Sequence, residues 1–172
     1  MNIINYEFKA ITNQLFQLEQ LLLQKNPIFI GEDNQVDTYY NIANGRLKLR
    51  EGNIENALIY YAREDVAGAK QSDIILYKHN PDEALKQILK TIHGIKVVVT
   101  KKRRIYFIDN VKFHFDEVQG LGTFIEVEAI NTNGNIATCN LQQQCNEYIN
   151  FFNICHTNFV QQSYSDLLLA KG

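Results

Sequence analysis

Eight short segments of the chain alternate between apolar and polar side chains, a pattern typical of β-strands with one buried face. Successive side chains of a strand point to opposite faces, so a period of two separates each segment into an apolar set and a polar set. The predicted strands are residues 2–10, 35–41, 46–51, 57–65, 73–79, 96–109, 111–118 and 123–130.

Short connections between these segments favour an antiparallel sheet. Asn44-Gly45 separates the second and third predicted strands, and Asp109-Asn110 separates the sixth and seventh. Such dipeptides suit tight hairpins, whereas parallel strands need crossovers of about a dozen residues or more. Because eight strands are enough to close a barrel, the sequence predicts an α+β fold: a closed eight-stranded antiparallel β-barrel with surrounding α-helices.

Amphipathic helices are predicted between and after the strands. Each shows apolar residues on one stripe, and the first two follow a residue that can cap or open a helix. The predicted helices run from Thr12 to Lys25, from Pro81 to Ile92, over residues 136–154 and over residues 165–169. A length of 172 residues suits one domain, so we expect residues 1–172 to fold as a single unit.

Composition and charge narrow the class of protein. Hydrophobic residues make up 45% and charged residues 21% of the chain, an ordinary globular composition that excludes disordered and fibrous classes. The formal net charge of -2 provides no general attraction to nucleic acid or anionic membranes, so neither is an expected partner.

Glu7 and Lys9 interrupt the apolar run that a signal peptide needs, and no later stretch has the length of a membrane span. We therefore expect a cytoplasmic protein.

Several residues that could carry chemistry are better interpreted as structural. Cys139, Cys145 and Cys155 are odd in number and contain no C-x-x-C spacing, so we expect reduced packing residues rather than a disulfide framework or a zinc site. Tyr164 is interpreted as an anchor for the C-terminal helix, and not as part of a binding cavity.

The polar faces of the predicted strands are mostly charged. In the strand over residues 46–51, Leu47 and Leu49 oppose three basic residues, and solvent exposure is the simplest interpretation of any one such strand. The same separation recurs in five or six strands, however, without the mixed Thr, Ser and Gln of a solvated face. The shared surface would hold the bases Lys9, Arg46, Lys48, Arg50, Arg63, Lys101, Arg103 and Lys112, the acids Glu7, Asp116, Glu126 and Glu128, and His114.

A surface with so many basic and acidic side chains needs a ligand that binds both the positive and the negative groups. Arginine forks and lysine ammonium groups bind phosphate oxygens, while grouped carboxylates bind hard divalent cations that bridge those oxygens. The sequence therefore predicts a nucleoside triphosphate or a polyphosphate as the ligand, together with hard divalent cations.

Eight blocks of residues, taken in order, resemble the CYTH superfamily of triphosphate tunnel enzymes. The similarity covers nearly the whole chain, and the order and spacing of the blocks carry it. The blocks are NYEFK at 5–9, QVDTYY at 35–40, GRLKLRE at 45–51, LIYYAR at 58–63, KKR at 101–103, HFDEVQGLG at 114–122, FIEVE at 124–128 and SYSDLL at 163–168. The GRLKLRE, FDEVQGLG and SYSDLL blocks are most similar to the branch labelled class IV adenylyl cyclase-like.

The resemblance implies an eight-stranded tunnel barrel, Mg²⁺ or Mn²⁺ dependence and a triphosphate substrate. It implies that phosphate is bound by Lys9, Arg46, Lys48, Arg50, Arg63, Lys101 and Arg103. Lys112 and His114, which share the same charged surface, are expected as further substrate contacts. It also implies that Glu7, Asp116, Glu126 and Glu128 hold the metals and, with Lys9, serve catalysis. The chain departs from the family pattern E-x-E-x-K at its first acid, where Asn5 offers a neutral oxygen and is expected to lower metal affinity.

Three functions remain open. A class IV adenylyl cyclase would convert ATP to 3′,5′-cyclic AMP and pyrophosphate. A triphosphatase would instead direct water at the terminal phosphorus of tripolyphosphate, thiamine triphosphate or a nucleotide. A non-catalytic binder of a phosphorylated ligand is favoured if Asn5 prevents a metal from being held. The spacing identifies neither the general base, which would accept the proton of the attacking hydroxyl, nor a pocket for the nucleobase. A homodimer is a further possibility.

Overall fold

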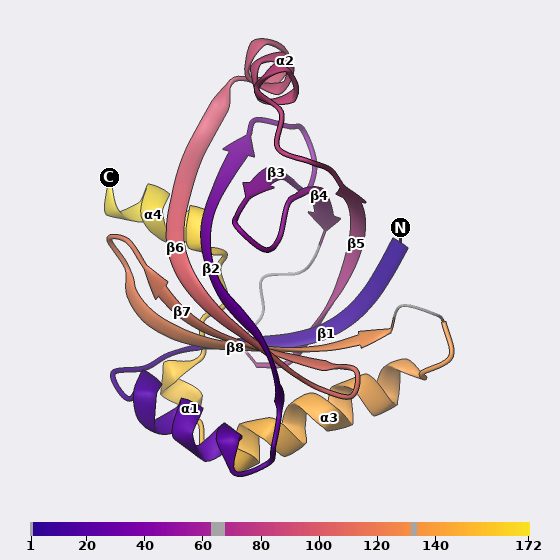
Figure 1. Ribbon diagram of the computed structural model, residues 1–172, viewed down its shortest axis with the longest axis vertical. Coiled ribbons are helices and arrows are strands. Elements are labelled where there is room, and N and C mark those ends of the chain that lie inside the picture. Colours follow the sequence, from indigo (N-terminus) through magenta and orange to yellow (C-terminus); the bar gives the residue numbers. More distant parts are fainter. Residues whose placement is uncertain (1, 63–67, 132–133) are drawn as a thin grey trace.

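The barrel predicted from the alternating pattern is present in the computed structural model, which describes residues 2–62, 68–131 and 134–172. The strands close an antiparallel barrel in the order β1-β5-β4-β3-β2-β6-β7-β8 (Figure 1). The strands are β1 Asn2–Ile11, β2 Ile28–Tyr40, β3 Arg46–Glu51, β4 Ala57–Ala62, β5 Lys70–Lys78, β6 Ile95–Ile108, β7 Val111–Val118 and β8 Gly122–Asn131. The predicted α+β fold with a closed eight-stranded antiparallel barrel is confirmed.

Two strands begin earlier than predicted. Strand β2 begins at Ile28 instead of residue 35, because its first residues are consecutively apolar and its pairing with β6 is irregular between Phe29 and Gly31. That irregularity breaks the period of two on which the prediction depends. Strand β5 begins at Lys70 instead of residue 73. The predicted end of the fourth strand, residues 63–65, lies outside the described residues.

Four α-helices surround the described barrel. Asp82 caps the second helix by accepting a 2.7 Å hydrogen bond from the backbone N–H of Ala84, and Ser163 and Asp166 form a capping box at the fourth. Figure 1 shows α1 and α3 on the same side of the barrel and α2 beyond one end of it. The helices are α1 Leu15–Leu23, α2 Glu83–His93, α3 Thr138–Phe151 and α4 Tyr164–Lys171, with a 3-10 turn at His156–Asn158.

The main hydrophobic core lies outside the barrel, between its wall and helices α1 and α3. Phe8 of β1 and Phe113 of β7 turn outward and pack with Leu22 of α1 and Leu141 of α3, all fully buried. Cys145 is buried in the same cluster, and all three cysteines are free thiols. The apolar faces of these strands therefore meet helices, which leaves their charged faces to line the interior.

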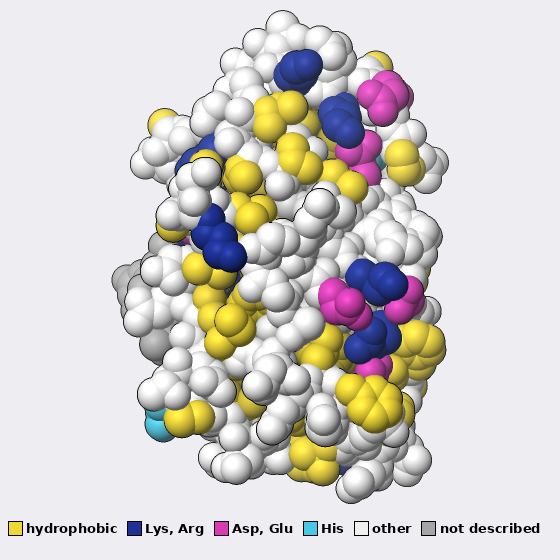
Figure 2. Space-filling view, turned by 90° about the vertical axis from the view of Figure 1, so that its left-hand side faces the viewer, with side chains coloured by type: hydrophobic (Ala, Val, Ile, Leu, Met, Phe, Trp, Pro, Cys, Tyr) yellow, Lys and Arg dark blue, Asp and Glu magenta, His cyan; other side chains and the backbone are white. Residues whose placement is uncertain are grey.

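The outer surface carries paired charges. Nζ of Lys102 lies 3.7 Å from Oε1 of Glu32, and Nε of Arg104 lies 2.8 Å from Oε1 of Glu19. The alternation along β6 therefore divides the basic run of residues 101–104 between the two faces. Figure 2 shows acidic and basic side chains next to one another on one outer face, among scattered hydrophobic groups. Among the described residues, no helix has both the length and the apolar character to cross a membrane.

Candidate functional site

The inward faces of the strands surround a cavity of about 440 Å³. This volume lies in the range of small-molecule sites. Strands β1, β2, β3, β6, β7 and β8 contribute charged side chains, and in β1, β7 and β8 the outward positions are taken by the apolar core. The structure brings to this cavity the predicted site residues Glu7, Lys9, Lys48, Arg50, Lys101, Arg103, Lys112, His114, Glu126 and Glu128.

Two predicted site residues are placed differently. Arg46 does not line the cavity; its Nη2 pairs with Oδ2 of Asp166 in α4 at 2.7 Å. Asp116 is fully buried in the wall, where it accepts hydrogen bonds from Arg103 at 2.7 and 2.6 Å and from the hydroxyl of Tyr164 at 2.7 Å. Both of its oxygens are therefore engaged. Arg63 lies outside the described residues.

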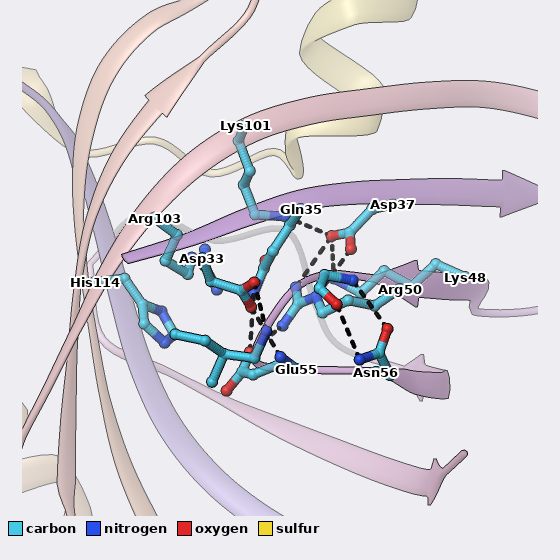
Figure 3. A network of polar contacts seen from close by, with 12 residues as sticks. Asp33, Gln35, Asp37, Lys48, Arg50, Glu55, Asn56, Lys101, Arg103 and His114 are labelled. Atoms are coloured by element: carbon cyan, nitrogen blue, oxygen red, sulfur yellow. Dashed lines mark hydrogen bonds and ion pairs between the residues drawn. The ribbon is translucent and has the colours of Figure 1, made fainter. Parts of the chain in front are cut away.

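Asp37 of β2 pairs with three of the side chains that are predicted to bind phosphate (Figure 3). Its carboxylate accepts hydrogen bonds from Lys101 at 2.6 Å, from Lys48 at 3.1 Å and from Arg50 at 2.8 and 3.0 Å. Burial would raise the pKa of Asp37, but the three cations hold it well below its usual value of 3.8. Arg50 also pairs with Glu55, which Lys112 contacts, so four basic groups share two carboxylates and this part of the cavity attracts a further anion.

Lys101 is the cation most affected by burial. Removal from water, together with the neighbouring charges of Arg50, Arg103 and Lys48, lowers the pKa of Lys101 to about 7, although Asp37 opposes the shift. The charge of this ammonium group therefore changes near neutral pH. An incoming phosphate would favour the charged form.

Glu55, in the loop between β3 and β4, adds a second carboxylate to the basic region. It accepts hydrogen bonds from Lys112 and, over 2.9 Å, from Nη1 of Arg50. Burial would raise the pKa of Glu55, but these two cations hold it well below its usual value of 4.5. Its backbone N–H donates a 2.9 Å hydrogen bond to Asp33, which anchors the loop to β2. Gly52 permits this approach, since an added Cβ there would lie 2.5 Å from Oδ1 of Asp33.

Asp33, Asp37 and Glu55 are absent from the predicted site. Asp33, Gln35 and Asp37 alternate along the inner face of β2 and are all buried, so a strand that begins at residue 28 would have revealed Asp33, whereas Asp37 already lies within the predicted strand. The predicted strand begins at residue 35, and the charged faces described above do not include Asp37. Glu55 lies in a loop, where side-chain alternation gives no signal.

The acidic residues gather where β1, β7 and β8 are adjacent. Glu7 of β1 lies directly opposite Glu128 of β8, and Lys9 lies opposite Glu126. Glu126 also pairs with Arg103, whose Nη2 lies 2.8 Å from its Oε2. Burial would raise the pKa of Glu126, but the charges around it, Lys9 first, hold it well below 4.5.

His114 of β7 faces the same carboxylates from the neighbouring strand. Its Nδ1 lies 3.5 Å from Oε2 of Glu126 and 3.6 Å from Oε1 of Glu128. Burial, with the charges of Arg103 and Lys112, lowers the pKa of His114 below 6.5, so the ring is neutral at pH 7. One ligand atom from each of His114, Glu126 and Glu128 lies within 4.8 Å of the others, close enough for one metal ion.

Asn5, which stands where the family pattern has its first acid, lies next to the acidic residues of β1 and β8. Asn5 is 1% exposed, and its Nδ2 donates a 3.4 Å hydrogen bond to Oε2 of Glu7. A carboxylate at this position would place a further negative charge beside Glu7 and Glu128. Asn5 instead contributes a donor that orients Glu7.

Another part of the cavity wall, which adjoins the basic region at Lys48, is apolar and aromatic. Tyr39 and Tyr61 line it, and the hydrophobic side chains that share the wall come from β4, β5 and the loop before β4. These hydrophobic residues are Ile54, Ala57, Ile59, Ile74 and Leu76. The cavity therefore offers separate surfaces to a polyanion and to an uncharged organic group.

Tyr164 also lines the cavity, which corrects its interpretation as a helix anchor alone. Ser163 caps α4, so Tyr164 is the first helical residue and its ring enters the barrel. Its hydroxyl donates to Asp116, and Nζ of Lys9 lies 4.1 Å from the ring centroid. A cation over an aromatic face is attracted by the ring quadrupole, so Tyr164 helps to position Lys9.

Comparisons with known proteins agree with this geometry. The family model described as CYTH domain matches residues 4–144 of the chain. A protein of Methanocaldococcus jannaschii, provisionally named an adenylate cyclase, is 27% identical over 148 residues, which cover 81% of this chain and 83% of that protein.

Solved structures share the fold at low identity. A conserved hypothetical protein from Pyrococcus furiosus matches with a TM-score of 0.80 and 18% identity, over 95% of this chain and 99% of that chain. A protein from Hippeastrum, described as an adenylyl cyclase candidate with a dominant triphosphatase activity, matches with a TM-score of 0.62 and 14% identity, over 98% of this chain and 95% of that chain. At these identities the likeness shows the fold alone.

Proposed function

The chain belongs to the CYTH domain family, and we propose that it is a metal-dependent enzyme that converts ATP to 3′,5′-cyclic AMP and pyrophosphate inside its barrel. The family implies a triphosphate substrate and a divalent metal. The choice of ATP and of cyclisation is ours, and it is supported by the two kinds of surface in the cavity.

The observation that carries the proposal is the combination of a basic region and an apolar wall in one cavity. Lys48, Arg50 and Lys101 surround the carboxylate of Asp37. They would bind the oxygens of a triphosphate and give up some of their hydrogen bonds to Asp37. Inorganic tripolyphosphate would leave the apolar wall at Ile59 and Ile74 without a partner. A nucleoside triphosphate would use both surfaces.

The carboxylate cluster fits a divalent metal. Glu7 and Glu128 are like charges directly opposite each other on neighbouring strands, and a divalent cation between them would offset their repulsion. Glu126 adds further oxygen ligands, which suit Mg²⁺ or Mn²⁺. A divalent metal bound there supplies neutralisation of phosphate charge and a lowered pKa for the ribose 3′-hydroxyl.

The residues of the chain position the reaction. In the proposed step, the ribose 3′-oxygen forms a bond to the α-phosphorus and releases its proton to solvent. The bond between the α-phosphorus and the bridging oxygen breaks, and pyrophosphate leaves with that electron pair. Lys9 and Arg103 lie beside Glu126 and would stabilise the charge that develops on the phosphates. Such chemistry depends on positioning and charge, so no covalent nucleophile is required.

A triphosphatase is the second candidate. The cyclase-like protein from Hippeastrum, which has the same fold, is described as having a dominant triphosphatase activity. The charged region described here would equally hold a triphosphate whose terminal phosphorus is attacked by water. The two reactions differ in which nucleophile reaches which phosphorus.

Product analysis tests the proposal. The purified protein is incubated with ATP, and separately with tripolyphosphate, in Mg²⁺ and then in Mn²⁺. A Glu126→Gln variant, checked by circular dichroism for an intact fold, is the control. Cyclic AMP with pyrophosphate, lost in the variant, would establish the cyclase.

Other products would replace this function with one of the alternatives. Orthophosphate that disappears in the variant would establish a triphosphatase. Metal-dependent binding of ATP without turnover would make the protein a binder of phosphorylated ligands.

A further inference from the structure

His114 is a buried histidine whose ring makes no close hydrogen bond with any residue that the structure describes. The side chain is 1% exposed and lines the cavity, and within the described part of the chain neither Nδ1 nor Nε2 finds a hydrogen-bond partner. Buried polar atoms are normally paired, so an unpaired ring inside a functional cavity indicates a partner supplied by a ligand. An imidazole nitrogen that makes no hydrogen bond can offer its lone pair to a metal.

The carboxylates in front of the ring offer the remaining ligands. Nδ1 of His114 faces oxygens of both Glu126 and Glu128, at 3.5 and 3.6 Å. These distances are longer than those of a good hydrogen bond. They leave room for the ring nitrogen and the two carboxylate oxygens to surround one ion, whose bonds to nitrogen and oxygen are about 2.0–2.2 Å. Glu7, opposite Glu128 on β1, adds negative charge to the same place.

Arg103 does not prevent this arrangement. Its guanidinium is shared between Asp116, at 2.7 and 2.6 Å, and Glu126, at 2.8 Å. If Oε2 of Glu126 turned to a metal, Arg103 would keep the two-pronged pairing with Asp116. The loss of one contact therefore does not leave a buried charge unpaired.

We propose that His114 is a direct ligand of the divalent metal, together with Glu126 and Glu128, and that its nitrogen shifts the preference of the site from Mg²⁺ toward Mn²⁺ and Co²⁺. Mg²⁺ favours an all-oxygen environment, whereas imidazole nitrogen suits the later first-row metals. This inference rests on the proposed use of a metal by these carboxylates. It does not depend on which triphosphate is converted.

Pulsed EPR of the Mn²⁺-loaded protein tests the bond without any substitution. Protein grown with histidine labelled with ¹⁵N in the ring should show a ¹⁵N coupling to Mn²⁺ in place of the ¹⁴N coupling of unlabelled protein. The assay needs no triphosphate and no turnover. Saturable Mn²⁺ binding without a nitrogen coupling would overturn the assignment of His114 and leave the proposed function standing.

Variants give a second readout. His114→Asn should weaken Co²⁺ binding, followed by visible d–d absorption, by about tenfold or more and Mg²⁺ binding by less than about threefold. His156→Asn is the matched control, because His156 is exposed on the 3-10 turn. An unchanged Co²⁺ spectrum and affinity in His114→Asn would overturn the inference alone. The absence of saturable binding of any of these metals by the wild type would overturn both the inference and the metal-dependent function.

Discussion

Nζ of Lys101 lies 2.6 Å from Oδ2 of Asp37, and both side chains are buried inside the barrel. Lys48 and Arg50 share the same carboxylate, so the four residues form one connected group. A phosphate that entered here would have to compete with Asp37 for these cations. The affinity of the site for a polyanion therefore depends on how firmly each cation stays charged.

We expect triphosphate affinity to fall as the pH rises above about 7, by up to about tenfold per pH unit. The pKa of Lys101 in the empty site is lowered to about 7, and a bound polyanion would raise it. Binding above pH 7 should therefore take up a proton. Calorimetry of tripolyphosphate binding in two buffers with different ionisation enthalpies measures that uptake directly.

Lys101→Arg separates this effect from the ionisation of the ligand. Arginine keeps its charge at every pH used, so the variant should bind with a shallower pH dependence and without this proton uptake. An identical pH profile in wild type and variant would show that Lys101 does not titrate near neutral pH.

Asp116→Asn should lower the free energy of unfolding by about 3 kcal/mol, because Arg103 loses its two-pronged buried partner. Its Co²⁺ affinity should change by less than about tenfold, in contrast to the larger loss in Glu126→Gln. Urea unfolding and Co²⁺ titration measure the two effects. A variant of normal stability that no longer bound the metal would make Asp116 a ligand, as the sequence predicts, instead of a residue that positions Arg103.

Ile74→Ala should raise KM for ATP by about fivefold or more and leave KM for tripolyphosphate nearly unchanged. Ile74 lines the apolar wall of the cavity, and the loss of apolar contact weakens binding only of a ligand with an organic group. Ile75→Ala is the matched control, since Ile75 is 52% exposed on the outer face of the same strand. Equal effects on both substrates would remove the apolar wall from substrate recognition.

The fold was predictable because most strands have one apolar and one charged face. Strand β7 has the predicted bounds of residues 111–118, with Phe113 and Phe115 outward and His114 inward. Most residues of the predicted charged set line the cavity, because alternation fixes the face of a side chain once the strand is known. Alternation alone cannot say which strands adjoin, so it does not show that Glu7 faces Glu128.

The rest of the site depends on contacts that no local pattern encodes. Glu55 reaches the cavity from a loop that Asp33 anchors, and the consecutive apolar residues before Gly31 conceal the true start of β2. Tyr164 enters the barrel because of where α4 begins. Each of these placements is set by tertiary packing or by a cap, and so appears only in the structure.

Leu141→Ala should lower the free energy of unfolding by about 2–5 kcal/mol, because Leu141 of α3 is fully buried against the outer face of the barrel. Triphosphate affinity at low temperature should stay unchanged, since the apolar core and the charged cavity use opposite faces of the same strands. Gln142→Ala, at the adjacent exposed position, is the control and should change stability by less than about 0.5 kcal/mol. Urea unfolding and calorimetry measure stability and affinity separately. A fold-intact Leu141→Ala protein with weakened triphosphate binding would show that α3 packing sets the geometry of the cavity, and that the two faces are coupled.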